Sequence, residues 1–483
     1  MKKLIIIVFI IFGAFLTLCL YRTFAYDTSV VEEVPSTTDL EYTFKIGNSS
    51  IKQITVDSGE TKYYDIVLGN PNNAKISYSV YYEMVSPSTK PDDYKIEYTS
   101  KSTGDSTGIV NNNGNITLNI VVTNTSSSAV TVKIGTVAGY VNGGELLLGS
   151  GQVVIPKKKV PATSIIEALD DGSTGDSGSG VYKIEHSAIP AESSATGSEI
   201  PAVTDYRYYG SSPNNYICLD MEGSSTCPDK HLYRIIGSIY EENAGQNLLK
   251  VIKATPLTDG TTSMFTWDCK STGSGDNIWA TVTSGNYSNS LTSGSSLMQL
   301  LNSGLWWNGT SGTYYNYDVV PTVNFTNYKL SDKAKSYITT SRYYLGGYNN
   351  TLLTNEMYGY ERGTLRYNMD RPLYWEGMVG LMYPSDYGYA AGDTCVTGTT
   401  LFNYKGGCMN KDWLYISNTY QWLMSSNSDH SNIVFLVYNA GQVNLNYLST
   451  AALAVSPVFY LNSSVSITNG DGSLNNPYLI TLE

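Results

Sequence analysis

Residues 76–82 read ISYSVYY, and residues 116–122 read ITLNIVV. In both stretches an apolar residue recurs at every second position, as Ile76, Tyr78 and Val80 illustrate. Successive side chains of a β-strand point to opposite faces of a sheet, so this alternation predicts strands with one buried face. Such half-buried strands are typical of antiparallel sheets, in which one face meets the core and the other meets solvent.

The same alternation extends from about residue 41 to residue 155. Turn sequences interrupt it, with GNP at 69–71 and NG at 113–114 and 142–143. These short motifs favour tight reversals of the chain. We expect about seven to nine short strands and no helix here, which predicts an antiparallel β-sandwich over residues 41–155.

A change of composition follows this predicted sandwich. Pro156 begins a lysine-rich stretch, and a flexible Gly/Ser/Asp run, DGSTGDSGSG, occupies 171–180. We therefore predict a linker over residues 156–205, interrupted by a short strand, VYKIEH at 181–186, that docks on the next domain. That second domain is expected to cover residues 206–483.

The second domain shows both helical and strand patterns. Leucines recur at helical spacing across 297–305 after Ser295, which can cap a helix, and a second helix is expected to start at Ser331. Continuous apolar runs at 233–240 and 433–438 predict central strands. With long Gly- and Tyr-rich loops between them, these features predict an α+β domain.

The first residues predict export from the cell. Two lysines precede an apolar run at 4–20, and Thr23 and Ala25 stand where a signal peptidase needs small residues. Residues 1–25 are therefore expected to be a signal peptide. The polar residues 26–40 are expected to be flexible.

A retained membrane anchor is the alternative, because 17 apolar residues reach the lower limit for a spanning helix. Either reading puts the protein outside the cell or on the outer face of the cytoplasmic membrane. The rest of the chain offers no comparable run, so contact with the membrane is expected only through this segment. The formal charge of −12 argues against nucleic acid as a partner.

The cysteines agree with export. Cys218 and Cys227 close one short loop, and Cys395 and Cys408 close another. Neither pair has the Cys-x-x-Cys spacing of redox or zinc sites, so both are predicted to form structural disulfides. Cys269 is left as a free thiol.

No catalytic motif stands out, because none of the three histidines lies in a metal-binding or nucleophile context. We therefore expect no enzyme activity and no catalytic residue.

Aromatic residues give the binding hypothesis. Tyr387 and Tyr389 lie two apart in SDYGYAAGD, a predicted exposed loop, where both rings would form one platform for a sugar or an apolar partner. Asp386 and Asp393 flank this platform, and Trp413 belongs to the same group of aromatic candidates. The two carboxylates also raise the question of calcium, but two ligands do not complete a calcium site, so no cofactor is expected.

Two resemblances add to this interpretation. VDSGETKYYDIVLGNPNNAKISYSVYYEM at 56–84 resembles surface β-sandwiches of the camelysin and biofilm-fibre class. Camelysins were named as metalloproteases, but residues 27–185 contain no histidine, so that activity is not carried over.

In the second domain, LYRIIGS, LMQLLNS, YGYERGT, GLMYPSDYGYA, WLMSS and SPVFYLNSSVSITNGDGSLNNPYLI occur in this order. The series is similar to uncharacterised exported proteins of Firmicutes. Its final block resembles the C-type-lectin-like fold, which lectins, adhesin tips and formylglycine-generating enzymes share. The resemblance implies a binding domain.

Together these observations predict a secreted or membrane-tethered surface protein of a Gram-positive bacterium that binds an extracellular glycan or protein. One alternative is an extracellular enzyme of unknown reaction. Another is a structural matrix or pilus-like subunit that assembles through the edge strands of its sandwich.

Overall fold

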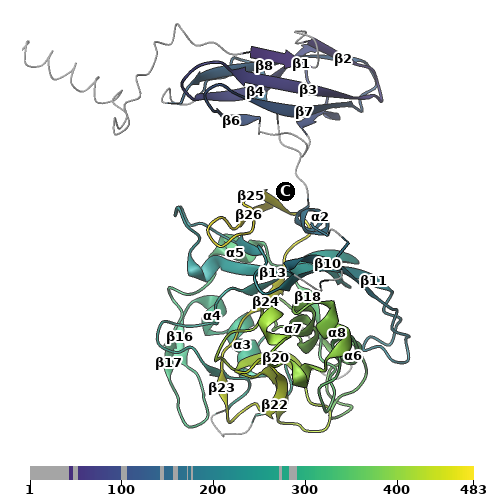
Figure 1. Cartoon of the computed structure of the whole chain (residues 1–483), viewed down its shortest axis with the longest axis vertical. Helices are drawn as coiled ribbons and strands as arrows, with labels where there is room; N and C mark the ends of the chain where they lie inside the picture. Colours follow the sequence, from purple (N-terminus) through teal and green to yellow (C-terminus); the bar gives the residue numbers. More distant parts are fainter. Residues whose placement is uncertain are drawn as a thin grey trace, which may run out of the picture. The chain divides into compact units, whose positions relative to one another are not determined.

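The computed structural model describes residues 43–46, 53–98, 106–141, 146–155, 161–170, 172–173, 175, 178–270, 275–281 and 291–482. It divides into two compact units, one up to Lys158 and one from Lys159 (Figure 1). Both units are rich in β-strand, as the sequence predicted. The predicted leader, 1–25, and the segment 26–40 lie outside the described residues. Among the residues that are described, no helix is long and apolar enough to span a membrane.

The first unit consists of two antiparallel sheets. The order of strands in one sheet is β1 (Thr43–Ile46), β3 (Thr61–Asn70), β7 (Gly114–Asn124) and β5 (Tyr94–Tyr98). The order in the other is β2 (Gln53–Val56), β8 (Val130–Tyr140), β4 (Ile76–Ser86) and β6 (Thr107–Val110), with β9 (Gln152–Val154) also paired to β4.

One core joins the two sheets of the first unit. Leu118 and Ile120 of β7 and Val80 of β4 are each fully buried in it. These are positions of the alternating pattern, so the pattern correctly identified the inward faces.

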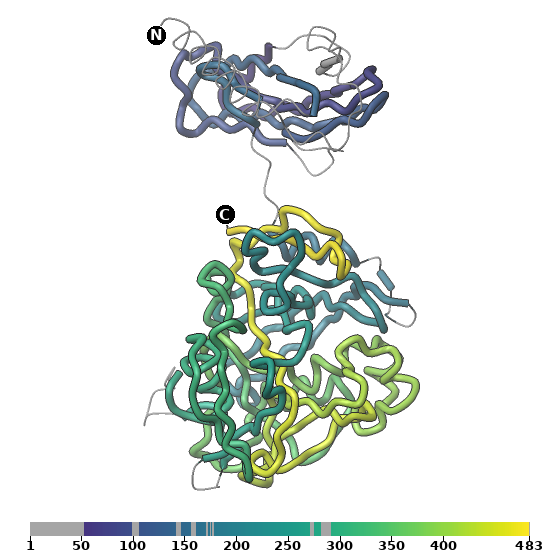
Figure 2. Tube along the Cα trace, turned by 90° about the vertical axis from the view of Figure 1, so that its left-hand side faces the viewer, coloured from purple at the N-terminus to yellow at the C-terminus, as the bar shows by residue number. Residues whose placement is uncertain are grey.

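The second unit is built on one large sheet. Its order is β10 (Ser179–His186), β11 (Val203–Gly210), β13 (Leu232–Glu241), β12 (Tyr216–Cys218), β26 (Tyr478–Leu482) and β25 (Val465–Asn469). β14 (Gln246–Lys253) pairs with β13, and β24 (Val458–Tyr460) pairs with β14. β12 and β26 run parallel, so the yellow end of the chain lies among the teal strands in Figure 2.

Smaller sheets complete the second unit. They are β15 (Phe265–Thr266) with β23 (Ala452–Leu453), β16 (Ser311–Thr313) with β17 (Thr322–Asn324), β18 (Ser341–Tyr344) with β19 (Tyr374–Gly377), and β20 (Gln421–Ser426) with β21 (Ile433–Val437) and β22 (Val443–Tyr447).

The helices are short and more numerous than the two expected. The described α-helices are α2 (Ala162–Glu167), α3 (Ser296–Asn302), α4 (Leu305–Asn308), α5 (Asp332–Ser336), α6 (Thr354–Glu361), α7 (Pro384–Ala390) and α8 (Asp393–Gly398). Single 3₁₀ turns are η2 (Asp229–His231), η3 (Leu401–Asn403) and η4 (Met409–Lys411). The two predicted helices are present, and the side chains of Ser295 and Ser331 cap α3 and α5.

The second unit begins earlier than the sequence indicated. Much of the predicted linker, 156–205, belongs to it, since Ile166, Val181 and Ile200 are buried in its core. The predicted strand at 181–186 is the greater part of β10, which pairs with β11 along its whole length. The polar composition of this segment suggested a linker, but a few well-spaced apolar side chains are enough to pack it against the sheet.

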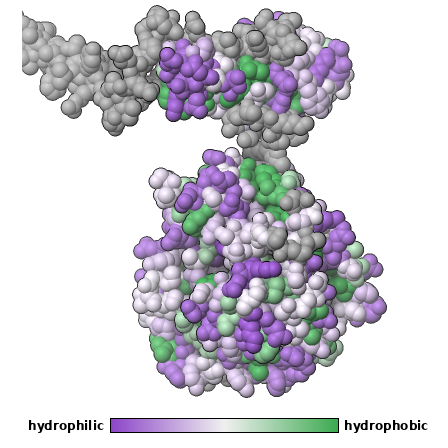
Figure 3. Space-filling model, in the orientation of Figure 1, coloured by the Kyte–Doolittle hydropathy of each residue, from purple (hydrophilic) through white to green (hydrophobic). Residues whose placement is uncertain are grey.

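Aromatic side chains fill the interior of the second unit. Five tryptophans are almost completely buried: Trp267, Trp279, Trp306, Trp375 and Trp422. On the face drawn in Figure 3, most apolar residues of the second unit stand singly among polar ones, apart from one group at its upper end. The aromatic richness of this unit is therefore largely a property of its core.

Candidate functional site

The predicted platform of Tyr387 and Tyr389 is not on the surface. Both residues lie in α7, and their exposed fractions are 0% and 2%. Pro384 takes the first helical position, and the backbone N–H of Tyr383 donates to Asp386, so the expected loop starts a helix instead. The prediction of an exposed loop was wrong.

Gly388 explains why a Gly-flanked tyrosine pair can be so deeply buried. A β-carbon at this position would lie 2.1 Å from Oγ1 of Thr354. Glycine therefore allows α7 to approach α6 closely. The hydroxyl of Tyr387 donates to the carbonyl of Gly441 at 2.7 Å, which satisfies its polar atom inside the core.

Asp386 and Trp413 are also interior residues, contrary to prediction. Asp386 is 1% exposed and Trp413 is 6% exposed. The indole N–H of Trp413 donates to the carbonyl of Tyr208 at 3.0 Å, and the guanidinium of Arg234 lies 4.3 Å from its ring centroid. The indole of Trp413 is thus fixed by a hydrogen bond at its N–H and by a guanidinium over its ring.

Asp386 belongs to a chain of buried charges. Its carboxylate accepts from Lys250 at 2.6 Å and from Arg207 at 2.8 Å. Arg207 also donates to Asp205 at 2.8 Å, and the two cations compensate the two anions. Burial alone would raise the pKa of Asp386, but Lys250 and Arg207 outweigh burial and lower this pKa. Because both oxygens of Asp386 are occupied, it is not available to calcium.

The charge chain ends at His186. The Nε2 atom of His186 lies 3.0 Å from Oδ2 of Asp205. The imidazole stacks on Tyr358, with ring centroids 3.8 Å apart. Burial lowers the pKa of His186, although Asp205 acts in the opposite direction. The imidazole is therefore neutral at neutral pH.

His186 forms part of the wall of a cavity of about 590 Å³. One wall consists of β10 and the residues that follow it, and the other consists of α6 and α8, with Tyr389 of α7 between them. The lining residues are Ser173, Tyr182, Lys183, Ile184, Glu185, His186, Ser187, Ala188, Ile189, Asn355, Tyr358, Gly359, Tyr389, Asp393, Val396 and Thr397. In Figure 1, α6 and α8 lie close to the edge of the sheet that ends in β10.

Two of the five predicted ligand-binding residues touch this cavity. Asp393, at the start of α8, is partly exposed there. Tyr389 forms a small apolar cluster with Tyr358 and Val396, against which Ile184 packs. The structure thus brings Tyr389 and Asp393 to one site, but not as the predicted platform.

Sequence reasoning missed His186, Asp205, Arg207 and Tyr358. One signal was present, since TDYRYYG places an acid and a base two residues apart within a strand. Charged side chains on a buried strand need partners of opposite charge. The partners come from elsewhere in the chain, so such a pair of residues indicates a buried network of charges. No local pattern links residue 186 with residue 358.

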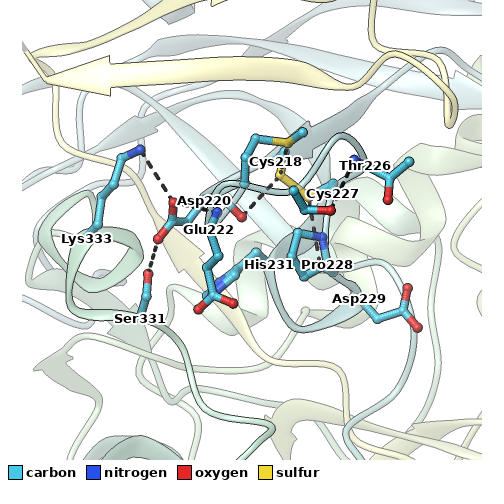
Figure 4. Close-up of a disulfide and its surroundings, with 12 residues drawn as sticks. Cys218, Asp220, Glu222, Thr226, Cys227, Pro228, Asp229, His231, Ser331 and Lys333 are labelled. Atoms are coloured by element: carbon cyan, nitrogen blue, oxygen red, sulfur yellow. Dashed lines mark hydrogen bonds and ion pairs between the residues drawn. A yellow bond between two sulfur atoms is a disulfide. The ribbon is translucent and has the colours of Figure 1, made fainter. Parts of the chain in front are cut away.

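A second cluster combines Asp220, Glu222 and His231, whose possible ligand atoms lie within 4.8 Å of one another (Figure 4). Each carboxylate is already paired with a lysine: Asp220 with Lys333 at 3.4 Å and Glu222 with Lys230 at 2.9 Å. The imidazole of His231 also bonds to Glu222, at 3.1 Å. A metal cation would have to displace these partners. We therefore interpret the cluster as a group of ion pairs and call it the ion-pair group.

The cysteines pair as predicted. Cys218 bonds to Cys227, and Cys395 bonds to Cys408. The first disulfide lies beside the ion-pair group (Figure 4). Cys269 is a buried free thiol.

Comparison with known proteins gives little further information. No family model matches the chain, and no curated protein matches it. One solved structure, the ASH / PapD-like domain (PapD-like domain 7) of human CEP192, is similar to 24% of this chain and 96% of its own length. The identity is 12% and the TM-score is 0.15, so this likeness carries no argument.

Proposed function

We propose that this chain is a bacterial cell-surface binding protein. In this proposal, a camelysin-like β-sandwich carries a C-type-lectin-like unit whose ligand occupies the cavity beside β10. The observation that carries the proposal is the cavity itself, about 590 Å³ with a wall of mixed polar and apolar groups on a rigid sheet.

Location outside the cell is supported by the Lys-rich start of the chain with its apolar run at 4–20 and by the two disulfides. Disulfides persist in oxidising compartments and are rare in the cytosol. The lectin-like assignment draws on the order of sequence motifs. It draws too on a sheet that takes strands from both ends of the unit, because β12 pairs with β26.

Binding is favoured over catalysis by the environment of His186. The charge of Asp205, its hydrogen-bond partner, is compensated by Arg207 at 2.8 Å. Among the described residues, no hydroxyl or thiol is hydrogen-bonded to His186, so no nucleophile is poised beside it.

Glycine 359 provides the test. Gly359 lines the cavity within α6, and a β-carbon added there meets nothing within 4 Å. Gly359→Trp should therefore fill the cavity without disturbing the helix. Gly407→Trp is the matched control, because Gly407 also has open space but does not line the cavity.

The protein and both variants would be screened on a glycan array and against a displayed peptide library. We expect at least one ligand that the wild type and Gly407→Trp bind equally and that Gly359→Trp loses. Turnover of an array component would favour the enzyme, and concentration-dependent fibres would favour the matrix subunit. Protease added to intact Gram-positive cells should digest the chain, whereas a protein that fractionates with the cytosol contradicts the proposal.

A further inference from the structure

Among the described residues, strand β10 lies at one edge of the large sheet. It is the last strand of the large sheet, and its ladder is with β11 alone. At its start, Val181 forms a parallel bridge with Asp170. Among the described residues, no backbone hydrogen bond is recorded on the outer edge of residues 182–188. In an antiparallel pair, alternate residues direct their N–H and C=O away from the neighbouring strand. On β10 these groups are directed away from β11, and residues 182–186 of the strand line the cavity.

The cavity follows this edge. Eight consecutive residues, 182–189, line it, which corresponds to roughly 26 Å of extended chain at about 3.3 Å per residue. The facing wall is helical and includes Gly359 of α6 and Val396 of α8. A groove of this length between an edge strand and a helical wall matches an extended peptide segment of about eight residues.

The aromatic rings of the cavity are not available for stacking on a sugar. Tyr358 has His186 at 3.8 Å and the guanidinium of Arg362 at 3.5 Å from its ring centroid. Two flat groups that close to one ring must occupy opposite faces, so both faces of Tyr358 are covered. Arg207 lies 4.8 Å from the ring centroid of Tyr389, and Tyr389 and Tyr182 are only 2% and 3% exposed. Glycan recognition by stacking therefore lacks a free face here.

The charges at the rim lead to the same ligand class. Lys183 and Glu185 form a salt bridge with each other, so neither is a dedicated charge receptor. Ile184 stands between them and packs against the cluster of Tyr358, Tyr389 and Val396. The β10 side of the cavity therefore has the apolar side chain of Ile184 between two charged residues that neutralise each other.

We propose that the ligand is an extended segment of another protein, which pairs with the edge of β10 as an additional strand and places an apolar side chain against Ile184. The inference rests on the proposed function and names its ligand class. Main-chain hydrogen bonds then supply affinity, and the apolar contact at Ile184 supplies selectivity.

A phage library of 12-residue peptides without cysteine tests the inference on the full-length protein. Selected peptides should carry an apolar residue near their centre, and Gly359→Trp should weaken them by about tenfold or more while Gly407→Trp leaves them unchanged. N-methylation removes one backbone donor at a time. N-methylation at every second residue should lower the affinity of the best peptide about tenfold, because one lost hydrogen bond is worth about that factor. N-methylation at the residues in between should lower the affinity much less.

The outcomes separate the inference from the proposed function. If glycans bind to the wild type but not to Gly359→Trp, and no peptide is selected, the cavity is still a binding site but its ligand is not a peptide. Peptides whose N-methyl scan has no period of two would overturn strand addition. If the wild type self-associates and Gly359→Trp does not, the ligand of the cavity is a second copy of this chain and not a segment of another protein. If neither probe binds, the proposed function falls together with the inference.

Discussion

Arg207 donates to Asp386 across 2.8 Å and so joins β11 to the first turn of α7, although 179 residues separate the two in the chain. Both side chains are 1% exposed. Lys250 supplies the second cation to Asp386. These contacts compensate the buried charge of Asp386, and they determine what a substitution of Asp386 will do.

Asp386→Ala should strongly destabilise the second unit. The substitution leaves the buried Lys250 without its anion, while Arg207 keeps only Asp205, and an uncompensated buried charge typically costs about 3–5 kcal/mol. All seven tryptophans lie in this unit, so their fluorescence during urea unfolding reports on it separately. Asp318→Ala, at an exposed position, should change the unfolding free energy by less than about 0.5 kcal/mol. Equal effects of the two substitutions would contradict the buried network.

Tyr387→Ala should lower stability, not binding alone. Removing a fully buried aromatic side chain typically costs about 3–5 kcal/mol, so the melting temperature should fall by several degrees. Tyr387→Phe keeps the ring but leaves the carbonyl of Gly441 without its donor, at a cost of about 1 kcal/mol. Tyr447→Ala is the exposed control. If Tyr387→Ala leaves the melting temperature unchanged, Tyr387 is not a buried core residue and the prediction is contradicted.

Sequence patterns predicted the parts of the fold that depend on local geometry. Alternation identified the inward residues of β4 and β7, such as Val80 and Ile120, because a strand alternates its faces whatever lies elsewhere. Ser295 and Ser331 marked helix starts, because a cap acts within one turn. Short cysteine loops allowed pairing by proximity.

The candidate site could not be predicted in the same way. SDYGYAAGD has the composition of a loop, but it is a buried helix that contacts residues far away in the chain, among them Arg207 of β11 and Lys250 of β14. The cavity joins His186 with residues of α6 and α8 far along the chain. These relationships are tertiary, and no local spacing records them.

The cysteines give a third prediction. Replacing Cys395 and Cys408 together by Ser opens a loop of 13 residues and should destabilise by about 3 kcal/mol in the chain-entropy model. Non-reducing peptide mapping should recover both disulfides. Cys269 is 2% exposed, so it should react with a thiol reagent only after denaturant is added. Rapid labelling of Cys269 in the native protein would show that this part of the core opens.

Glu361 gives the fourth prediction, which concerns pH. Its side chain is fully buried and accepts hydrogen bonds from the backbone N–H and the hydroxyl of Ser385. Burial raises the pKa of Glu361 from 4.5 to about 7, although Arg362 acts against this rise. Between those two values the folded protein holds a proton that the unfolded chain has released. The contribution of Glu361 to stability is therefore present below about pH 4.5 and is lost as the pH rises toward 7.

Glu361→Gln isolates this effect from the buried histidines. The lowered pKa values of His186 and His231 make stability rise with pH in the same range, so the wild-type curve alone mixes opposite slopes. In the difference between the two curves the histidines cancel. The distance from 4.5 to about 7 corresponds to about 3 kcal/mol, so the variant should gain about that much relative to the wild type between pH 4.5 and 7. Urea unfolding at several pH values measures this gain, and parallel curves would mean that Glu361 is ionised throughout.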